Sequence, residues 1–132
     1  MKKYFAEGQF AAVRYIVNDV DSSVNFYKDF LGFEIEQHVK SAFASLKLGG
    51  LRLFINSPGA GGAGHAMPDG TIPAPGGWNR FQVQVKNIES AVEDLKKQGA
   101  TFRNEIVKGV GGKQILLEDP SKNLIELFEF PS

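Results

Sequence analysis

The sequence predicts an α+β fold made of two similar halves, and three observations lead to this prediction. The segments 17–28 and 85–96 share one spacing of apolar residues. In each half, this segment follows one strand-like run and precedes three more, and a glycine- and proline-rich stretch separates the halves. The matching positions are Val17 and Val85, Val20 and Ile88, Val24 and Val92, and Lys28 and Lys96. A duplicated unit buries equivalent faces against its copy or a second chain, so we expect a pocket between the copies.

The first half begins with a β-branched and aromatic run over 10–17, which predicts a strand. A helix follows, because apolar residues recur at helical spacing on one face. These residues are Val20, Val24, Tyr27 and Leu31. Asp19 or Asp21 can accept the first free amides of this helix, and Gly32 supplies a left-handed stop. The remaining runs predict strands over 33–39, 42–48 and 51–56.

The second half repeats this order. A strand over 80–85 precedes a helix that ends at Gly99, with Ile88, Val92 and Leu95 on its apolar face. Three more strand patterns occupy 101–107, 114–118 and 124–130. Between the last two, residues 119–123 form a turn, because proline presets its backbone.

Residues 57–77 hold seven of the fifteen glycines and four of the six prolines. Such a stretch cannot bury enough apolar surface for a regular element, so we expect a linker or lid. The next element is a strand rather than a helix, which argues against a phosphate-binding loop. We therefore predict one domain over 1–132, with modules at 10–56 and 79–130 and a linker at 57–78.

Composition narrows the classes of partner. The chain has 132 residues, of which 42% are hydrophobic, enough for a core. Lys plus Arg and Asp plus Glu number 15 each, so no net charge attracts nucleic acid or an anionic membrane. Absence of cysteine excludes disulfides and thiolate chemistry. The N-terminus lacks an apolar signal core and no run reaches membrane-spanning length, so we expect a cytoplasmic protein.

The chain carries two further motifs, VNDV with FY and LGF over 17–33 and LEDPSKNLIEL over 117–127. Together they resemble the vicinal oxygen chelate superfamily, which includes glyoxalase I, bleomycin-resistance proteins, fosfomycin-resistance enzymes and extradiol dioxygenases. Residues 75–80 and 102–107 are similar to a glyoxalase-like branch of it. The resemblance implies two tandem βαβββ modules that form a half-barrel cleft, and commonly a homodimer. It also implies glycine where this chain has Lys122, so we expect either slight left-handed strain there or a different type of turn. The fold alone does not fix the function.

Enzymes of this superfamily hold a divalent ion with side chains from the first and last strands of each half, usually His, Gln or Glu. The resemblance and the repeat place these four ligand positions at Ala12, Leu53, Arg80 and Glu126. A catalytic metal usually needs at least three protein ligands, and a protonated guanidinium cannot ligate. We therefore predict no cofactor. A divalent metal ion would need His38 or His65, and neither has a second histidine at ligand spacing.

Strand alternation suggests what lines the cleft instead. It places Arg80 and Gln82 on the cleft side of one strand and Leu124, Glu126 and Phe128 on the cleft side of another. Arg80 and Glu126 could then pair, either as a structural plug or as part of a ligand site, with Glu126 as a candidate catalytic base.

The other candidates also have two interpretations. Arg14 could bind an anion beside Arg80 or reach solvent from its strand end. Trp78 could stack on a flat ligand or anchor the linker to the core. Gln82 and Gln114 could orient a polar ligand or lie in a wet groove. His65, in the linker, is interpreted as solvent-exposed.

Three functions remain open from the sequence. The first is a binder of a small anionic or aromatic molecule in the cleft, similar to bleomycin-resistance proteins, without a catalytic metal. The second is a glyoxalase-like lyase or isomerase or a dioxygenase-related enzyme, either metal-dependent through other ligands or metal-free through Glu126. The third is a non-catalytic module for dimerisation or partner binding. The absence of a ligand set favours the first.

Overall fold

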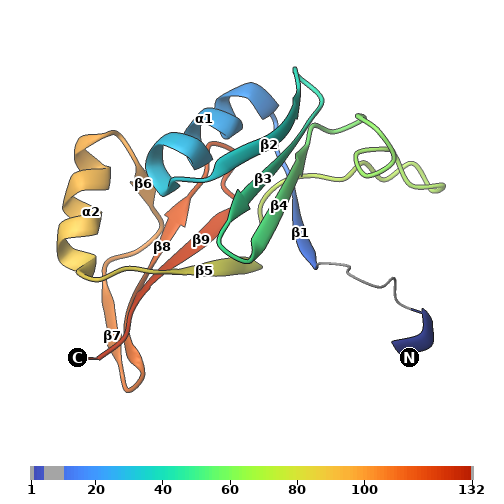
Figure 1. The fold of residues 1–132 in the computed structure, drawn as a ribbon. Helices are drawn as coiled ribbons and strands as arrows, with labels where there is room; N and C mark the ends of the chain where they lie inside the picture. The colour runs from blue at the N-terminus through green and yellow to red at the C-terminus, as the bar shows by residue number, and fades with distance from the viewer. Residues whose placement is uncertain (1, 5–10, 132) are drawn as a thin grey trace.

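The computed structural model of the protein describes residues 2–4 and 11–131, and it has the predicted α+β class with two sheets and two helices (Figure 1). A short 3-10 helix covers Lys2–Tyr4. The first half contains β1 (Ala12–Ile16), α1 (Val20–Leu31), β2 (Glu34–Val39), β3 (Phe43–Leu48) and β4 (Leu51–Asn56). The second half contains β5 (Arg80–Gln84), α2 (Ile88–Lys97), β6 (Thr101–Phe102), β7 (Val107–Gly109), β8 (Gly112–Glu118) and β9 (Leu124–Glu129).

Each half folds into a sheet of the same topology. The first sheet has the order β1-β4-β3-β2, and the second has the order β5-β9-β8-β6, with β7 also paired to β8. The opening strand of each half runs parallel to the closing strand, β1 to β4 and β5 to β9, whereas the other pairs are antiparallel. The two halves are therefore tandem βαβββ modules.

Both helices begin with the same local chemistry. Asp19 caps α1 by accepting from the backbone N–H of Ser22 at 3.1 Å, and Asn87 caps α2 by accepting from that of Ser90 at 3.0 Å. Of the two predicted caps for α1, Asp19 is therefore the one used. Gly32 ends α1 with a φ of 76°, a left-handed conformation that glycine adopts without a Cβ clash.

The core joins the two modules as well as filling each one. Phe81 on β5 contacts Tyr15 on β1, with ring centroids 5.8 Å apart, and also contacts Tyr27 of α1 at 6.5 Å. The Tyr15 hydroxyl donates to the backbone oxygen of Leu124 at 2.6 Å. Burial raises the pKa of Tyr15 to about 12, so the hydroxyl remains a donor. These contacts place β1 beside β5, where the two sheets meet (Figure 1).

One predicted strand is wrong in its extent. The run over 101–107 divides into β6 and β7, because the residues between them do not continue the regular backbone pairing with β8. The backbone N–H of Arg103 still donates to Leu116, but the side chain of Asn104, rather than a backbone carbonyl, accepts from the N–H of Leu116 at 3.0 Å. The predicted strand over 10–17 begins at Ala12 in β1, and its first residue lies outside the described residues.

The segment 57–79 contains no helix or strand, as predicted, and part of it projects away from both sheets (Figure 1). Its end is fixed to the second module, since the N–H of Gly76 donates to the Asn123 side chain at 2.9 Å. Among the described residues, no helix is long and apolar enough to cross a membrane.

Candidate functional site

Side chains of the second sheet divide between a core face and a polar face. Phe81 is buried, whereas Arg80, Gln82 and Gln84 point to the opposite side of β5, because successive side chains of a strand alternate. We call this polar side the Arg80 face. Cross-strand pairing adds Leu124, Glu126 and Phe128 from β9 and Gln114, Leu116 and Glu118 from β8.

The centre of the Arg80 face is a three-residue cluster. The Nε of Arg80 donates to one carboxylate oxygen of Glu126 at 3.0 Å, and the Nε2 of Gln82 donates to the other at 2.9 Å. Glu126 is buried, with 8% of its surface exposed, whereas the side chain of Arg80 is one-third exposed. The two Nη groups of Arg80 have no partner among the described residues. Glu126 is thus capped on both oxygens, and Arg80 keeps free donors.

The first sheet presents a corresponding face on the side of Arg14, which we call the Arg14 face. The guanidinium of Arg14 donates from Nη1 to the Asn56 side chain and lies 5.0 Å from the centre of the Phe54 ring. No described carboxylate neutralises Arg14. Tyr15 and Phe81, which follow Arg14 and Arg80 in sequence, are in contact on the core side of β1 and β5, with ring centroids 5.8 Å apart.

The assignment of Leu53 to a ligand position is wrong. Leu53 is fully buried in the hydrophobic core, so its side chain cannot reach either polar face. The register pairs Arg14 with Phe54 just as it pairs Gln82 with Glu126, and so Phe54 is the counterpart of Glu126. The equivalent positions are therefore Ala12 and Phe54 in the first module, and Arg80 and Glu126 in the second. Ala12 is exposed, as expected for a residue on the Arg14 face.

The remaining candidates lie around this centre. Trp78 is 69% exposed, so it does not anchor the linker to the core. Its ring instead lies under the guanidinium of Arg103, 5.0 Å from its centre. Gln114 is half-buried and pairs with Phe128, beyond Glu126 along the same face. His65 is exposed in the linker. Arg80, Gln82 and Glu126 are thus in contact, whereas no direct contact joins Arg14, Trp78 or Gln114 to them.

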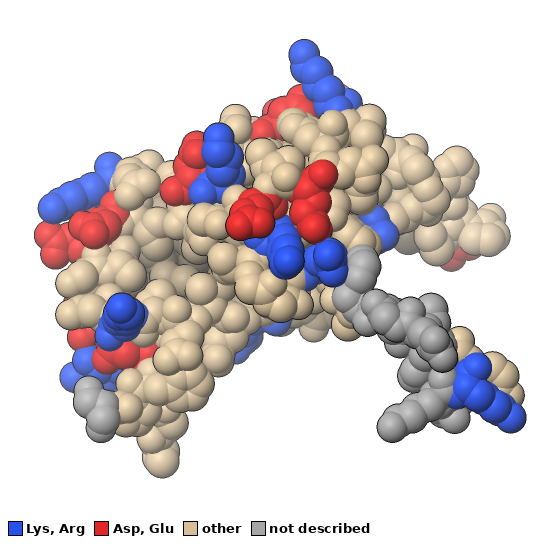
Figure 2. All heavy atoms as spheres, in the orientation of Figure 1, with Lys and Arg blue, Asp and Glu red and all other residues tan. Residues whose placement is uncertain are grey.

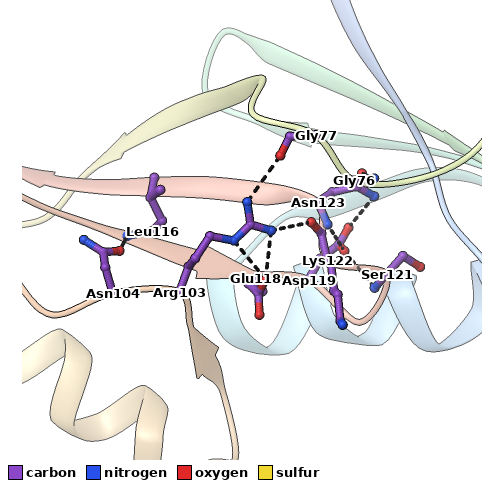
Figure 3. A network of polar contacts seen from close by, with 10 residues as sticks. All are labelled: Gly76, Gly77, Arg103, Asn104, Leu116, Glu118, Asp119, Ser121, Lys122 and Asn123. Atoms are coloured by element: carbon purple, nitrogen blue, oxygen red, sulfur yellow. Dashed lines mark hydrogen bonds and ion pairs between the residues drawn. The ribbon is translucent and has the colours of Figure 1, made fainter.

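Two residues next to this site have roles that the sequence did not reveal (Figure 3). Asp119 is buried and accepts from the backbone N–H groups of Ser121 and Asn123, each at 2.8 Å, and from the Tyr27 hydroxyl at 2.8 Å. Burial raises the pKa of Asp119 above its ordinary value in spite of these donors. The second residue, Arg103, binds Glu118. The sequence predicts the turn at 119–123. It does not predict that Asp119 binds Tyr27 or that Arg103 binds Glu118, because these partners are distant in sequence.

Two cavities of the described structure lie away from this cluster. One of about 390 Å³ lies between α1 and residues 99–101 and 118–120, and one of about 280 Å³ lies between the end of α1 and α2. Neither is lined by Arg80 or Glu126. The Arg80 cluster is accordingly a feature of an open sheet face.

Charge is distributed in pairs rather than in patches. Figure 2 shows basic and acidic side chains next to one another on the visible side of the molecule, without a large area of one sign. The pairs include Arg52 with Glu36 at 2.9 Å and Lys113 with Glu89 at 2.7 Å. A specific anion site therefore depends on individual donors such as those of Arg80.

The residues at the four equivalent positions do not suit a divalent metal ion. Ala12 and Phe54 carry no ligand atom, and the guanidinium of Arg80 is a donor only. Both oxygens of Glu126 already accept hydrogen bonds. Within the described part of the chain, no three His, Cys, Asp or Glu side chains gather closely enough to hold a metal.

Comparison with known proteins agrees with the duplicated βαβββ architecture. Residues 9–127 match the Glyoxalase/Bleomycin resistance protein/Dioxygenase superfamily, and the chain belongs to this superfamily. A search of curated proteins finds no match.

Solved structures share the fold at low sequence identity. A protein from Agrobacterium tumefaciens solved by NMR has a TM-score of 0.74 and 19% identity, over 94% of this chain and 98% of that one. A superfamily member from Sphaerobacter thermophilus has a TM-score of 0.71 and 21% identity, over 96% and 98% of the two chains. Lactoylglutathione lyase from Agrobacterium tumefaciens has a TM-score of 0.70 and 17% identity, over 95% and 96%.

Proposed function

We propose that this protein binds a small anionic molecule between the Arg80 and Arg14 faces, without a catalytic metal ion. The observation that carries the proposal is the state of Arg80. Its Nε is held by Glu126, which fixes the guanidinium plane, while its Nη groups have no protein partner among the described residues. A fixed guanidinium with free, parallel N–H donors matches the geometry of a carboxylate or phosphate group.

Arg14 supplies the positive charge that the Arg80 cluster lacks. Arg80 and Glu126 together are neutral, so they would orient an anion without strongly attracting it. Among the described residues, Arg14 contacts a neutral amide and an aromatic ring, and none of their carboxylates pairs with it. The neighbouring residues Tyr15 and Phe81 are in contact, with ring centroids 5.8 Å apart, and this supports a ligand that lies between the two guanidinium groups.

The alternative is an enzyme, such as a glyoxalase-like lyase or isomerase, in which Glu126 removes a proton. A general base must reach the substrate proton through a free lone pair. Each oxygen of Glu126 already accepts one hydrogen bond, from Arg80 or from Gln82, and the side chain is only 10% exposed, so little of the carboxylate is accessible to a substrate. This arrangement favours Glu126 as the residue that orients Arg80, and favours binding over proton transfer.

A titration of anions against neutral analogues tests the proposal. We expect cyclohexanecarboxylate to bind by calorimetry and to raise the melting temperature, and cyclohexanecarboxamide to do neither. Arg80→Gln should weaken carboxylate binding about tenfold or more, since hydrogen bonds to charged groups contribute about 1.5–3 kcal/mol. Lys97→Gln is the matched control, because it removes one positive charge from an exposed pair on α2.

Two results would contradict this proposal. One is equal binding of the carboxylate and the carboxamide, which would remove the role of charge. The other is tight binding of zinc, nickel, manganese or iron(II) that is lost in Glu126→Ala, which would restore a metal-dependent enzyme. A turnover assay would then replace the binding assay as the relevant measurement.

A further inference from the structure

Trp78 combines high exposure with a fixed position. It is 69% exposed, although a tryptophan gains more than most residues from burial. The Arg103 guanidinium lies 5.0 Å from the ring centre on one side, a distance typical of a cation–π contact. The exposed remainder of the ring is available to a ligand.

Arg103 is itself held by four hydrogen bonds (Figure 3). Its Nε and Nη2 both donate to one oxygen of Glu118, at 3.1 and 2.9 Å. The remaining bonds go to backbone oxygens, that of Gly77 at 3.3 Å and that of Lys122 at 3.2 Å. Because Nε, Nη1 and Nη2 are all engaged, the orientation of the guanidinium is determined by β8, by the β8–β9 turn and by the linker.

The backbone before Trp78 is fixed by the same network. Gly76 donates its N–H to Asn123 at 2.9 Å, and Gly77 offers its carbonyl to Arg103. Both glycines have positive φ, 102° and 98°, which residues with a Cβ rarely adopt. These two hydrogen bonds, together with the contact between Trp78 and Arg103, fix the backbone that enters β5 and the position of Trp78.

Trp78 lies next to Arg80 in space as well as in sequence. Two residues apart, their Cα atoms are separated by at most about 7 Å. Arg80 pairs with Leu124, and Leu124 pairs with Glu118, so Arg80 and Glu118 lie in one row of the Arg80 face. Arg103 donates to Glu118 of that row, and its guanidinium also contacts the Trp78 ring. Trp78 is therefore linked to the Arg80 face through Arg103.

We propose that Arg103 is a positioning residue that holds Trp78 as a stacking surface for the flat, aromatic part of the anion bound by Arg80. The inference rests on the proposed function and narrows its ligand class to aromatic carboxylates and similar aromatic anions. Arg80 would bind the acid group, and Trp78 would cover one face of the ring. An alicyclic acid of equal charge and similar size would use Arg80 alone.

The first test compares benzoate with cyclohexanecarboxylate by calorimetry. Aromatic pairs add about 0.5–1.5 kcal/mol beyond area, so benzoate should bind about three- to tenfold more tightly. Trp78 is the one tryptophan of the chain, so fluorescence excited at its absorption edge reports on this site alone. Benzoate should quench it. In Trp78→Ala the ratio of the two affinities should fall to about one; the residue is exposed, so the core remains intact.

The second test separates positioning from mere stabilisation. Arg103→Lys keeps the charge but replaces a planar guanidinium that makes four hydrogen bonds with an ammonium group that has three donors and no flat face to lie over Trp78. We expect the preference for benzoate to fall towards one, and time-resolved anisotropy to show fast rotation of the indole that the parent protein lacks. A purely structural role would lower the melting temperature and leave both readings alone. Lys97→Gln, remote from the network, should retain the parent ratio.

The outcomes distinguish the two proposals. If both acids bind equally well in the parent protein, the stacking surface is refuted while the anion site survives. If neither acid binds, the anion site and the stacking surface are both refuted. An indole that stays immobile in Arg103→Lys would refute the role of Arg103 alone.

Discussion

Lys122 and Ser41 have left-handed backbone conformations, with φ of 68° and 66°. For a residue with a Cβ this conformation costs about 1–2 kcal/mol. Each is retained because neighbouring groups fix the turn. The N–H of Lys122 donates to the Asp119 carbonyl at 2.9 Å, and its own carbonyl accepts from Arg103. Ser41 is held through Asp21, which accepts from its N–H at 3.0 Å. Of the two expectations for the turn at Lys122, left-handed strain is therefore the one that the structure shows.

We predict that Lys122→Gly raises the free energy of unfolding by about 0.5–1 kcal/mol, the relief of the left-handed strain less the greater chain entropy of glycine. The backbone contacts of residue 122 do not need its side chain. Urea denaturation followed by circular dichroism measures the change. Ser41→Gly is a useful comparison, because it also loses the 3.3 Å contact of its hydroxyl with Asp21 and should gain less. A destabilised Lys122→Gly protein would contradict the account.

Residue-level prediction worked where the cause lies within a few positions in sequence. The Asp19 cap, the Gly32 stop and the strain at Lys122 all follow from local backbone chemistry. It did not reveal Asp119, whose partner Tyr27 is 92 positions away. Nor did it reveal Arg103, whose partners come from three separate segments.

At the level of elements, helices and most strands could be predicted from periodicity, but the register between strands could not. The resemblance and the repeat placed Leu53 at the position that corresponds to Glu126. Hydrogen-bond pairing matches Phe54 to Glu126 instead. A one-residue slip turns every side chain to the opposite face of a sheet, which is why this small misalignment moved a core leucine into the proposed site.

The β7–β8 hairpin depends on one glycine. At Gly112 the φ is 142°, and an added Cβ would lie 2.3 Å from the Glu129 carbonyl and 2.9 Å from the Phe128 ring. The backbone oxygen cannot move without breaking the pairing of β8 with β9. The neighbouring Gly111 has room, since its nearest contact with an added Cβ would be 3.9 Å.

We predict that Gly112→Ala lowers the free energy of unfolding by about 2 kcal/mol or more, whereas Gly111→Ala changes it by less than about 1 kcal/mol. The pair is matched in chemistry and adjacent in sequence, so only the local geometry differs. Thermal melts of both variants give the comparison. Similar melting temperatures for the two would show that the hairpin can relax around the added methyl group.

At the level of the whole molecule, the β8–β9 turn joins the two modules. Tyr27 of α1 donates to Asp119, and burial raises the pKa of Tyr27 well above its ordinary value, so the hydroxyl stays protonated. The N–H of Asn18 donates to the Ser121 hydroxyl at 2.8 Å, and the Asn123 side chain donates to the Ile16 carbonyl at 2.9 Å. The duplication in the sequence predicted two equivalent modules. It did not predict that the β8–β9 turn of the second module would make these contacts with the first.

This junction should give a pH-dependent contribution to stability. The pKa of Asp119 is raised in the folded protein, chiefly by burial, so the folded state binds its proton more tightly than the unfolded state does. The stabilisation that protonated Asp119 gives to the folded state is therefore fully present at pH values below its ordinary pKa of 3.8. It is lost as pH rises through the raised pKa of the folded protein. Exposed carboxylates with lowered pKa values, Asp21, Asp69 and Glu89, act in the opposite direction.

Asp119→Asn isolates the effect, because asparagine does not titrate while the exposed carboxylates remain. We expect the stability of the parent protein, relative to this variant, to be greatest at low pH and to decline as pH rises above 3.8. Urea denaturation at several pH values measures the difference. A difference that is constant with pH, or that grows as pH rises, would show that the donors around Asp119 outweigh its burial.

We propose that the protein forms a homodimer. Several large apolar side chains are exposed near the β7–β8 hairpin, namely Val107 at 48%, Phe130 at 49% and Val110 at 105%. Single exposed apolar residues are ordinary, but these three, in β7, in the turn that connects it to β8 and directly after β9, form a candidate contact surface. We predict a mass of twice 14.5 kDa by light scattering at micromolar concentration.

Val107→Asp with Val110→Asp should give the single-chain mass, because burial of two carboxylates in an apolar contact is unfavourable. A single-chain mass for the parent protein would refute the dimer, and a dimeric double variant would place the contact elsewhere.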